Sequence, residues 1–154
     1  MKILLIDDTN RHRKAGKQQL VALGHEVKSF GTYSGARHAV ESGETFDAAL
    51  IDLNMPAEID PWGAGFPKEY LGQSVAVGYP LALSLSLLGI PCVALSSDGG
   101  HHANPYNAML DWLKGKPLEV NGRKIIYLEA LMTKNDAGEL VKDWSAALEI
   151  ILHQ

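Results

Sequence analysis

The chain has little cysteine and no excess of basic residues, and both shortages limit what it can be. Its 154 residues include one cysteine, Cys92, so no internal disulfide can form, which fits a reducing cytoplasm. Cys92 stands in an apolar stretch, where a buried, unreactive thiol is expected. The net charge is −4, so nucleic acid is not an expected partner. Basic residues do cluster at Arg11, Arg13, Lys14 and Lys17, but their spacing predicts the solvated face of a helix.

Charged residues are absent between Glu69 and Asp98, a stretch long enough to cross a membrane. Pro80, Gly89 and Pro91 interrupt it, so a buried helix followed by a buried strand is the better interpretation, and no membrane partner is expected. The first residues are not expected to form a signal peptide, because their apolar run is short and acids follow at once. The length and the 46% hydrophobic content predict one well-buried domain over residues 1–154.

Strand-like and helix-like segments alternate along the chain, which indicates a three-layer α/β domain. Strands are predicted at residues 1–6, 26–30, 46–51, 92–96 and 123–128. Helices are predicted at about 9–23, 32–42, 74–88, 104–114 and 137–152. Asn121-Gly122 predicts a tight turn that joins residues 118–120 to the last strand as a β-hairpin. The irregular stretch 56–73 contains Trp62, Phe66 and Tyr70, and is expected to be a lid, a partner surface or a packed loop.

Two of the predicted strands end in carboxylates for which core packing gives no reason. Asp7 and Asp8 follow the first strand, and Asp52 follows the third. The carboxyl ends of parallel strands form a crevice in which ligands bind. Three carboxylates there would repel one another unless a cation lay among them, and hard oxygen ligands suit Mg²⁺ or Mn²⁺. The alternative is that these acids are caps and turn formers at strand ends.

The acidic pair, the phrase Asp52-Leu-Asn-Met-Pro56 and the helix end Leu23-Gly-His-Glu-Val27 together resemble the receiver domain of two-component response regulators. The resemblance covers residues 1–56. It implies a flavodoxin-like (CheY-like) doubly wound sheet of five parallel strands in the order 2-1-3-4-5, to which the hairpin adds a short extra strand. It also implies an atypical, stand-alone cytoplasmic receiver that accepts a phosphoryl group on Asp52. The donor would be a histidine kinase or phosphotransfer protein, the target a downstream protein, and the only chemistry self-phosphorylation and autodephosphorylation.

The resemblance implies a role for each matching residue. In chain order the matches are Asp7 and Asp8 (Mg²⁺-binding acids), Asp52 (phosphoacceptor and metal ligand), Asn54 (a backbone carbonyl on the ion), Ser96 (a hydroxyl that hydrogen-bonds the phosphoryl group) and Tyr127 (the switch aromatic). With these residues the phosphoryl transfer would be a displacement in which positioning and electrostatics supply the catalysis.

The resemblance breaks at the family's lysine, whose position is taken by Ala130. An alanine does not neutralise charge on a phosphoryl group, and Lys134, shortly downstream, is the candidate that could reach back. Without a lysine the alternative is a pseudo-receiver, which keeps the fold as a protein-interaction module and is not phosphorylated. The intervals between Asp52 and Ser96 and between Ser96 and Tyr127 are also longer than in the family.

A further cluster of chemically active residues follows the fourth predicted strand, at Asp98, His101 and His102. These residues are predicted to extend the acid cluster into a transition-metal site, since imidazole and carboxylate ligands together suit Zn, Mn or Fe. The chain would then be a metal-dependent hydrolase or a small-molecule binder. A histidine standing in for the lysine as a phosphate contact is a second interpretation. Solvated side chains on a glycine-rich loop are the third.

Overall fold

The computed structural model describes residues 1–58, 68–97 and 112–153. Its central sheet has six strands, which are β1 (Lys2–Ile6), β2 (Glu26–Phe30), β3 (Ala48–Asp52), β6 (Cys92–Ser97), β7 (Pro117–Val120) and β8 (Arg123–Glu129). They lie in the order β2-β1-β3-β6-β8-β7. All neighbours pair in parallel except β7, which pairs antiparallel with β8. The predicted sheet, with five parallel strands and one added hairpin strand, is confirmed.

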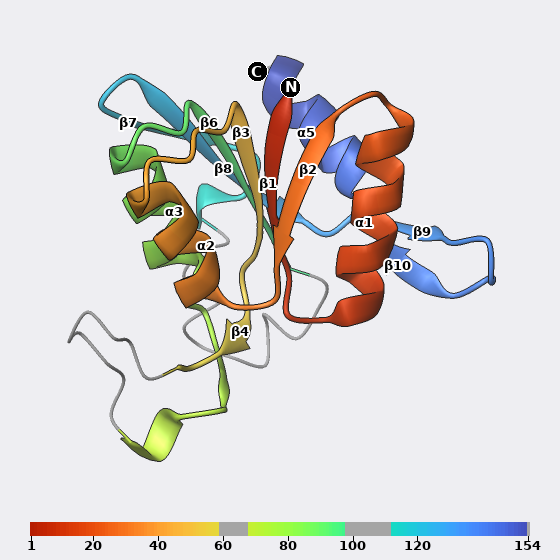
Figure 1. The fold of residues 1–154 in the computed structure, drawn as a ribbon, viewed down its shortest axis with the longest axis horizontal. Coiled ribbons are helices and arrows are strands. Elements are labelled where there is room, and N and C mark those ends of the chain that lie inside the picture. Colours follow the sequence, from red (N-terminus) through yellow and green to blue (C-terminus); the bar gives the residue numbers. More distant parts are fainter. Residues whose placement is uncertain (59–67, 98–111, 154) are drawn as a thin grey trace.

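Helices cover both faces of this sheet. In the described residues they are α1 (Asn10–Ala22), α2 (Tyr33–Glu41), α3 (Gly78–Leu87) and α5 (Trp144–His153). Figure 1 shows α2 and α3 on one face and α1 and α5 on the other. Each face has its own apolar cluster, which includes Val40 and Leu85 on the first and Leu20 and Leu148 on the second. None of the described helices is long and apolar enough to cross a membrane.

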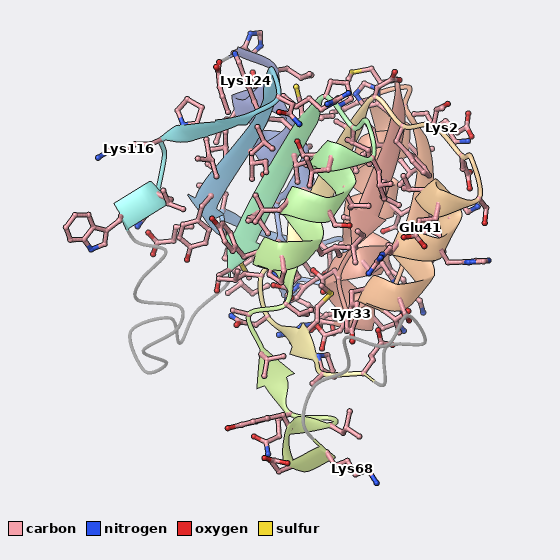
Figure 2. The ribbon with its side chains drawn as sticks, turned by 90° about the vertical axis from the view of Figure 1, so that its left-hand side faces the viewer. Lys2, Tyr33, Glu41, Lys68, Lys116 and Lys124 are labelled. Carbon is pink, nitrogen blue, oxygen red and sulfur yellow. The ribbon has the colours of Figure 1, made fainter. Side chains whose placement is uncertain are left out.

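The central strands are apolar on both faces because helices cover both. Every residue of β3 is buried, and so are Ile3 to Ile6 of β1. The carboxyl ends of these strands share one edge, which is the lower edge in Figure 1. Figure 2 marks the two edges of the sheet: Lys2 and Lys124 lie near the starts of β1 and β8, and Tyr33 lies toward the carboxyl edge. Polar residues that end β1, β3 and β6 are therefore brought together.

The segment after β3 differs from the predicted loop and helix. The two-residue strands β4 (Met55–Pro56) and β5 (Ser74–Val75) pair antiparallel, and the short 3₁₀ helix η1 (Lys68–Tyr70) lies between them. Because residues 74 and 75 belong to this ladder, α3 starts at Gly78 rather than at residue 74. The segment extends beyond the carboxyl edge, with Lys68 at its far end (Figure 2). The expected lid residues Trp62 and Phe66 lie outside the described residues, and Tyr70 is exposed.

The hairpin between β7 and β8 follows the sequence signal closely. Asn121 and Gly122 both have positive φ, at 51° and 74°. A two-residue turn of this kind matches the right-handed twist of the strands and strongly favours Asn-Gly. The predicted hairpin is therefore confirmed. The helix predicted over residues 104–114 lies mostly outside the described part of the chain.

The predicted last helix, residues 137–152, is wrong in its first half. Residues 140–142 instead form β10 (Leu140–Lys142), which pairs antiparallel with β9 (Met132–Lys134) in a second hairpin. Its turn is closed by the Asn135 side chain, whose Oδ1 accepts from the backbone N–H groups of residues 137 and 139 at 3.1 and 2.9 Å. Gly138 has a φ of 76°, which a helix does not allow. The hairpin projects beside α1 (Figure 1).

The helix α5 then starts from an aspartate cap. Oδ1 of Asp143 accepts a hydrogen bond from the backbone N–H of Ala146 at 3.0 Å and another from the Ser145 hydroxyl. Aspartate is among the preferred residues at this position, because its carboxylate satisfies N–H groups that have no partner within the helix. The cap fixes the point where β10 ends and α5 begins, directly after Lys142.

Candidate functional site

Three carboxylates meet at the carboxyl edge of the sheet, as predicted. One ligand oxygen from each of Asp7, Asp8 and Asp52 lies within 4.8 Å of the others. Asp7 and Asp52 are buried, with relative exposures of 0% and 4%, whereas Asp8 is partly exposed. Buried acids need compensation by cations or hydrogen bonds. The three clustered carboxylates therefore favour a positive charge at this site.

The loop that carries Asp7 and Asp8 is held by α1. Nη1 of Arg13 donates to the backbone carbonyls of both acids, and the backbone N–H of Thr9 donates to Oδ1 of Asp7 at 2.9 Å. The guanidinium packs over Gly31, where an added Cβ would lie 2.9 Å from Nη1. Of the basic residues predicted on a solvated helix face, Arg11, Lys14 and Lys17 are exposed, whereas Arg13 is half-buried because its guanidinium bonds the acidic loop.

A lysine does lie at the site, which corrects the expectation that it has none. Nζ of Lys142 lies 2.9 Å from Oδ1 of Asp52 and 3.5 Å from Oδ2 of Asp7, and the side chain is only 1% exposed. Lys142 ends β10, so the β9–β10 hairpin separates it from Ala130 and returns the chain to the carboxyl edge. Lys134, the residue expected to reach back, is exposed on β9. The cation comes from a different residue than the sequence indicated.

The charges at this site leave room for a further cation. Burial raises the pKa of Asp7 above its ordinary value, and the ammonium of Lys142 and the nearby His12 oppose that rise. One ammonium against three carboxylates leaves the described cluster net negative when all are ionised. Oxygen-only ligands of this kind suit Mg²⁺, which binds through one or two carboxylates and keeps several waters. The residues present therefore fit a divalent cation held by Asp7, Asp8 and Asp52.

Two serines and an asparagine line the edge beside Asp52. Ser96 is the direct partner of Asp52 in the β3–β6 ladder and is buried, so both side chains project from the same face of the sheet. Asn54 donates from its backbone N–H to Oδ1 of Asp52 at 3.3 Å and from Nδ2 to the Ser97 hydroxyl at 3.2 Å. The register agrees with the predicted place of Ser96. The phosphoryl contact of Ser96 and the metal-binding carbonyl of Asn54 stay predictions.

Tyr127 lies on the opposite face from Lys142. It pairs with Leu95 in the β6–β8 ladder, is buried, and belongs to the apolar cluster under α2 and α3. Its backbone carbonyl accepts from the N–H of Gly115 at 2.8 Å. Its role as a switch stays a prediction. Asp98, His101 and His102 lie outside the described residues, and so does the transition-metal site that they would form.

The metal site makes a direct prediction. We expect Mg²⁺ at millimolar concentration to raise the thermal midpoint of unfolding, because a ligand that binds only the native state stabilises it. Asp8→Asn should remove most of that gain, since it deletes one ligand charge without opening the buried core. The measurement is thermal denaturation followed by circular dichroism with and without saturating Mg²⁺. Asp136→Asn, an exposed acid in the β9–β10 turn, should keep the full gain, and an unchanged wild-type midpoint would contradict the site.

No protein-family model matches the sequence, and no curated protein matches it. Solved structures do match. The N-terminal domain of a response regulator/sensory box/GGDEF three-domain protein from Carboxydothermus hydrogenoformans is 15% identical with a TM-score of 0.59, and the match covers 99% of this chain and 92% of that one. A response regulator receiver protein from Sinorhizobium medicae gives the same values. The receiver domain of the hybrid histidine kinase CckA is 17% identical, with 99% and 97% coverage and a TM-score of 0.56.

These matches span nearly the whole chain, whereas the sequence resemblance reaches only residue 56. At such low identity they establish the fold and nothing finer: the chain has the CheY-like receiver fold. The fold predicted from the acidic motifs is confirmed.

Proposed function

We propose that the chain is a phosphoacceptor receiver of a two-component pathway, with Asp52 as the nucleophile. One observation carries the proposal: a buried ammonium, that of Lys142, contacts Asp52 and Asp7 within a cluster of three acids at the carboxyl edge of the sheet. Buried charges of this kind contribute little net stability. Their arrangement is explained better by a reaction in which the negative charge of a phosphoryl group must be stabilised than by a contribution to folding.

The reaction is a displacement at phosphorus. A carboxylate oxygen of Asp52 forms a bond to phosphorus, the bond to the donor breaks, and its electron pair leaves with the donor group. The Lys142 ammonium lies 2.9 Å from Oδ1 of Asp52, so it would stabilise the negative charge that develops on the phosphoryl oxygens. Ser96 would donate its hydroxyl hydrogen to one of those oxygens. Water later attacks the acyl phosphate and restores the carboxylate.

A divalent cation bound by Asp7, Asp8 and Asp52 would neutralise charge on the phosphoryl oxygens. The carbonyl of Asn54 is the fourth protein ligand that we propose. The donor is a protein phosphohistidine, on a histidine kinase or a phosphotransfer protein. Its P–N bond breaks readily, so the phosphoryl group can pass to a carboxylate. The output goes to a downstream protein partner.

Of the alternatives, the interaction module has lost its main support. A pseudo-receiver that only binds proteins was suggested by the absence of a lysine, and Lys142 removes that reason. A hydrolase or small-molecule binder would use the acids together with Asp98 and His101, which lie outside the described residues, and no described contact favours it. The acids and the ammonium that are described suit transient phosphorylation of the chain itself.

The proposal is tested by incubating the chain with acetyl phosphate and Mg²⁺ and measuring its intact mass over time. We expect one added phosphoryl group per chain, lost again on standing as the acyl phosphate hydrolyses. Fragment mass spectrometry should place the group on Asp52. Omission of Mg²⁺ should prevent the labelling. A chain that binds Mg²⁺ and never gains the group would favour the interaction-module alternative.

A further inference from the structure

The backbone around Lys142 is held by two side chains of α1. The N–H of Lys142 donates to Nδ1 of His12 at 3.2 Å, and the Lys142 carbonyl accepts from Nε2 of Gln19, also at 3.2 Å. Oε1 of Gln19 in turn accepts from the N–H of Trp144 at 2.9 Å. One amide side chain thus bonds the carbonyl before Asp143 and the N–H after it. His12 and Gln19 therefore hold the backbone at the junction between β10 and α5, including both the N–H and the carbonyl of Lys142.

The spacing of His12 and Gln19 along α1 allows both to bond the Lys142 backbone. His12 and Gln19 are separated by two helical turns, so both project from one face of α1. Gly16 lies between them, and a Cβ there would be 2.3 Å from Cδ1 of Trp144. The absence of that Cβ lets the indole lie against α1, with its ring 5.4 Å from Nζ of Lys142. The helix therefore contacts the backbone of the lysine and the aromatic ring beside its ammonium.

The β9–β10 hairpin does not join the central sheet in the described residues, and its last residue, Lys142, reaches that sheet through ion pairs with Asp52 and Asp7. Its strands pair only with each other, and an isolated two-stranded hairpin is marginally stable. The Asp143 N–H donates to the carbonyl of Leu131 at 2.7 Å, which closes the base of the hairpin but does not connect it to α1. The hydrogen bonds with α1 therefore hold the backbone from which the Lys142 ammonium reaches the acids.

We propose that Gln19 and His12 are positioning residues for phosphoryl transfer, because they hold Lys142 so that its ammonium contacts Asp52. The inference rests on the proposed function, and it assigns to one face of α1 the placing of a lysine that the β9–β10 hairpin separates from the end of β8. Neither residue touches the reacting atoms in this scheme. Both act only through Lys142.

The first experiment measures the rate of labelling by acetyl phosphate in a double-mutant cycle. Gln19→Ala should slow labelling about tenfold or more, because a misplaced catalytic group can cost up to about 10²-fold. Gln18→Ala, an exposed neighbour that lines the same hollow beside the hairpin, should leave the rate unchanged. In a Lys142→Met background, Gln19→Ala should have no further effect. A merely structural role would slow both backgrounds equally and would overturn the inference.

The second experiment is independent of phosphorylation. Acetylation of Lys142 by dilute acetic anhydride, without Mg²⁺ or phosphodonor, is quantified by peptide mass spectrometry against the exposed Lys17. Wild type and Gln18→Ala should protect the buried amine, and Gln19→Ala should increase its acetylation several-fold. Equal protection in all three would overturn the inference. If wild type never accepts a phosphoryl group, the proposed function fails on its own test, while this readout still decides whether α1 positions the lysine.

A pair of variants at His12 tests the hydrogen bond that the Lys142 N–H donates to Nδ1 of His12. His12→Asn keeps a side-chain acceptor near Nδ1, whereas His12→Leu removes it. We expect the asparagine to retain most of the labelling rate and of the Lys142 protection, and the leucine to lose both. Because His12 is buried, thermal midpoints are recorded for both variants. Equal labelling and equal protection in two folded variants would remove His12 from the proposal.

Discussion

Replacing Asp52 with asparagine is expected to abolish phosphoryl labelling of the chain by acetyl phosphate. The substitution keeps the size of the side chain but replaces the nucleophilic carboxylate with an amide, which does not form the acyl phosphate. Lys142 keeps Asp7 as a partner at 3.5 Å, so the variant should fold. It should also gain less thermal stability from Mg²⁺, because one of three clustered carboxylates is gone. The measurements are intact mass after incubation and the thermal midpoint with Mg²⁺.

The matched control for this prediction is Asp47→Asn. Asp47 lies just before β3, at the opposite edge of the sheet, where its Oδ2 accepts from the backbone N–H of Lys2 at 2.6 Å. The same chemical change there should leave labelling at the wild-type rate. Undiminished labelling of Asp52→Asn would identify another nucleophile and contradict the proposed function.

The fold and the acids of the site could be predicted because their signals are local. A buried parallel strand needs an unbroken apolar run, so the carboxylates that end β1 and β3 stand out in the sequence. Once the sheet order is known, Asp7, Asp8 and Asp52 must meet, and Ser96 must follow the neighbouring strand. The Asn121-Gly122 turn is equally local. Each of these predictions depended on a few adjacent residues and on one general rule of α/β topology.

The lysine could not be predicted because its place depends on a tertiary return of the chain. Leu140, Trp144, Leu148 and Ile151 recur at helical spacing, so the periodicity favoured a helix that begins before residue 140. Asn135 and Gly138 are residues that favour a turn, but the helical periodicity begins directly after them and hides that signal. With residues 137–142 predicted as helix, Lys142 was not among the predicted site residues, and the site was left without its cation.

The α1 residues at the site were missed for a related reason. Basic residues at helical spacing usually form a solvated face, and nothing in the sequence around Arg13 shows that the acidic loop covers it. His12 likewise gave no signal, although it is buried and accepts from the Lys142 backbone. His12 contacts Lys142, which is 130 residues away in the chain, and Arg13 depends on how the preceding loop folds against α1. The acids were therefore predictable from the sequence, but the α1 residues that hold the acidic loop and Lys142 in place were not.

Lys142→Met is expected to have opposite effects on metal binding and on phosphoryl transfer. Methionine is long and uncharged, so it fills the space without contributing a cation. Two buried carboxylates then lose their partner, and breaking a buried ion pair typically costs about 3–5 kcal/mol. Without Mg²⁺ we therefore expect a lower free energy of unfolding in urea. With Mg²⁺ much of that loss should be recovered, and the ion should bind more tightly than to wild type, because a competing positive charge has been removed.

Labelling by acetyl phosphate should nevertheless slow in the same variant, by about 10²–10³-fold, which is the usual cost of losing one electrostatic contact in the transition state. Lys134→Met, an exposed lysine on the other strand of the same hairpin, should change neither the stability nor the rate. A Lys142→Met variant that binds Mg²⁺ and labels as fast as wild type would show that the ammonium only compensates buried charge. Tighter Mg²⁺ binding together with slower labelling would show that this lysine acts in the transfer itself, since a merely destabilised site would lose both.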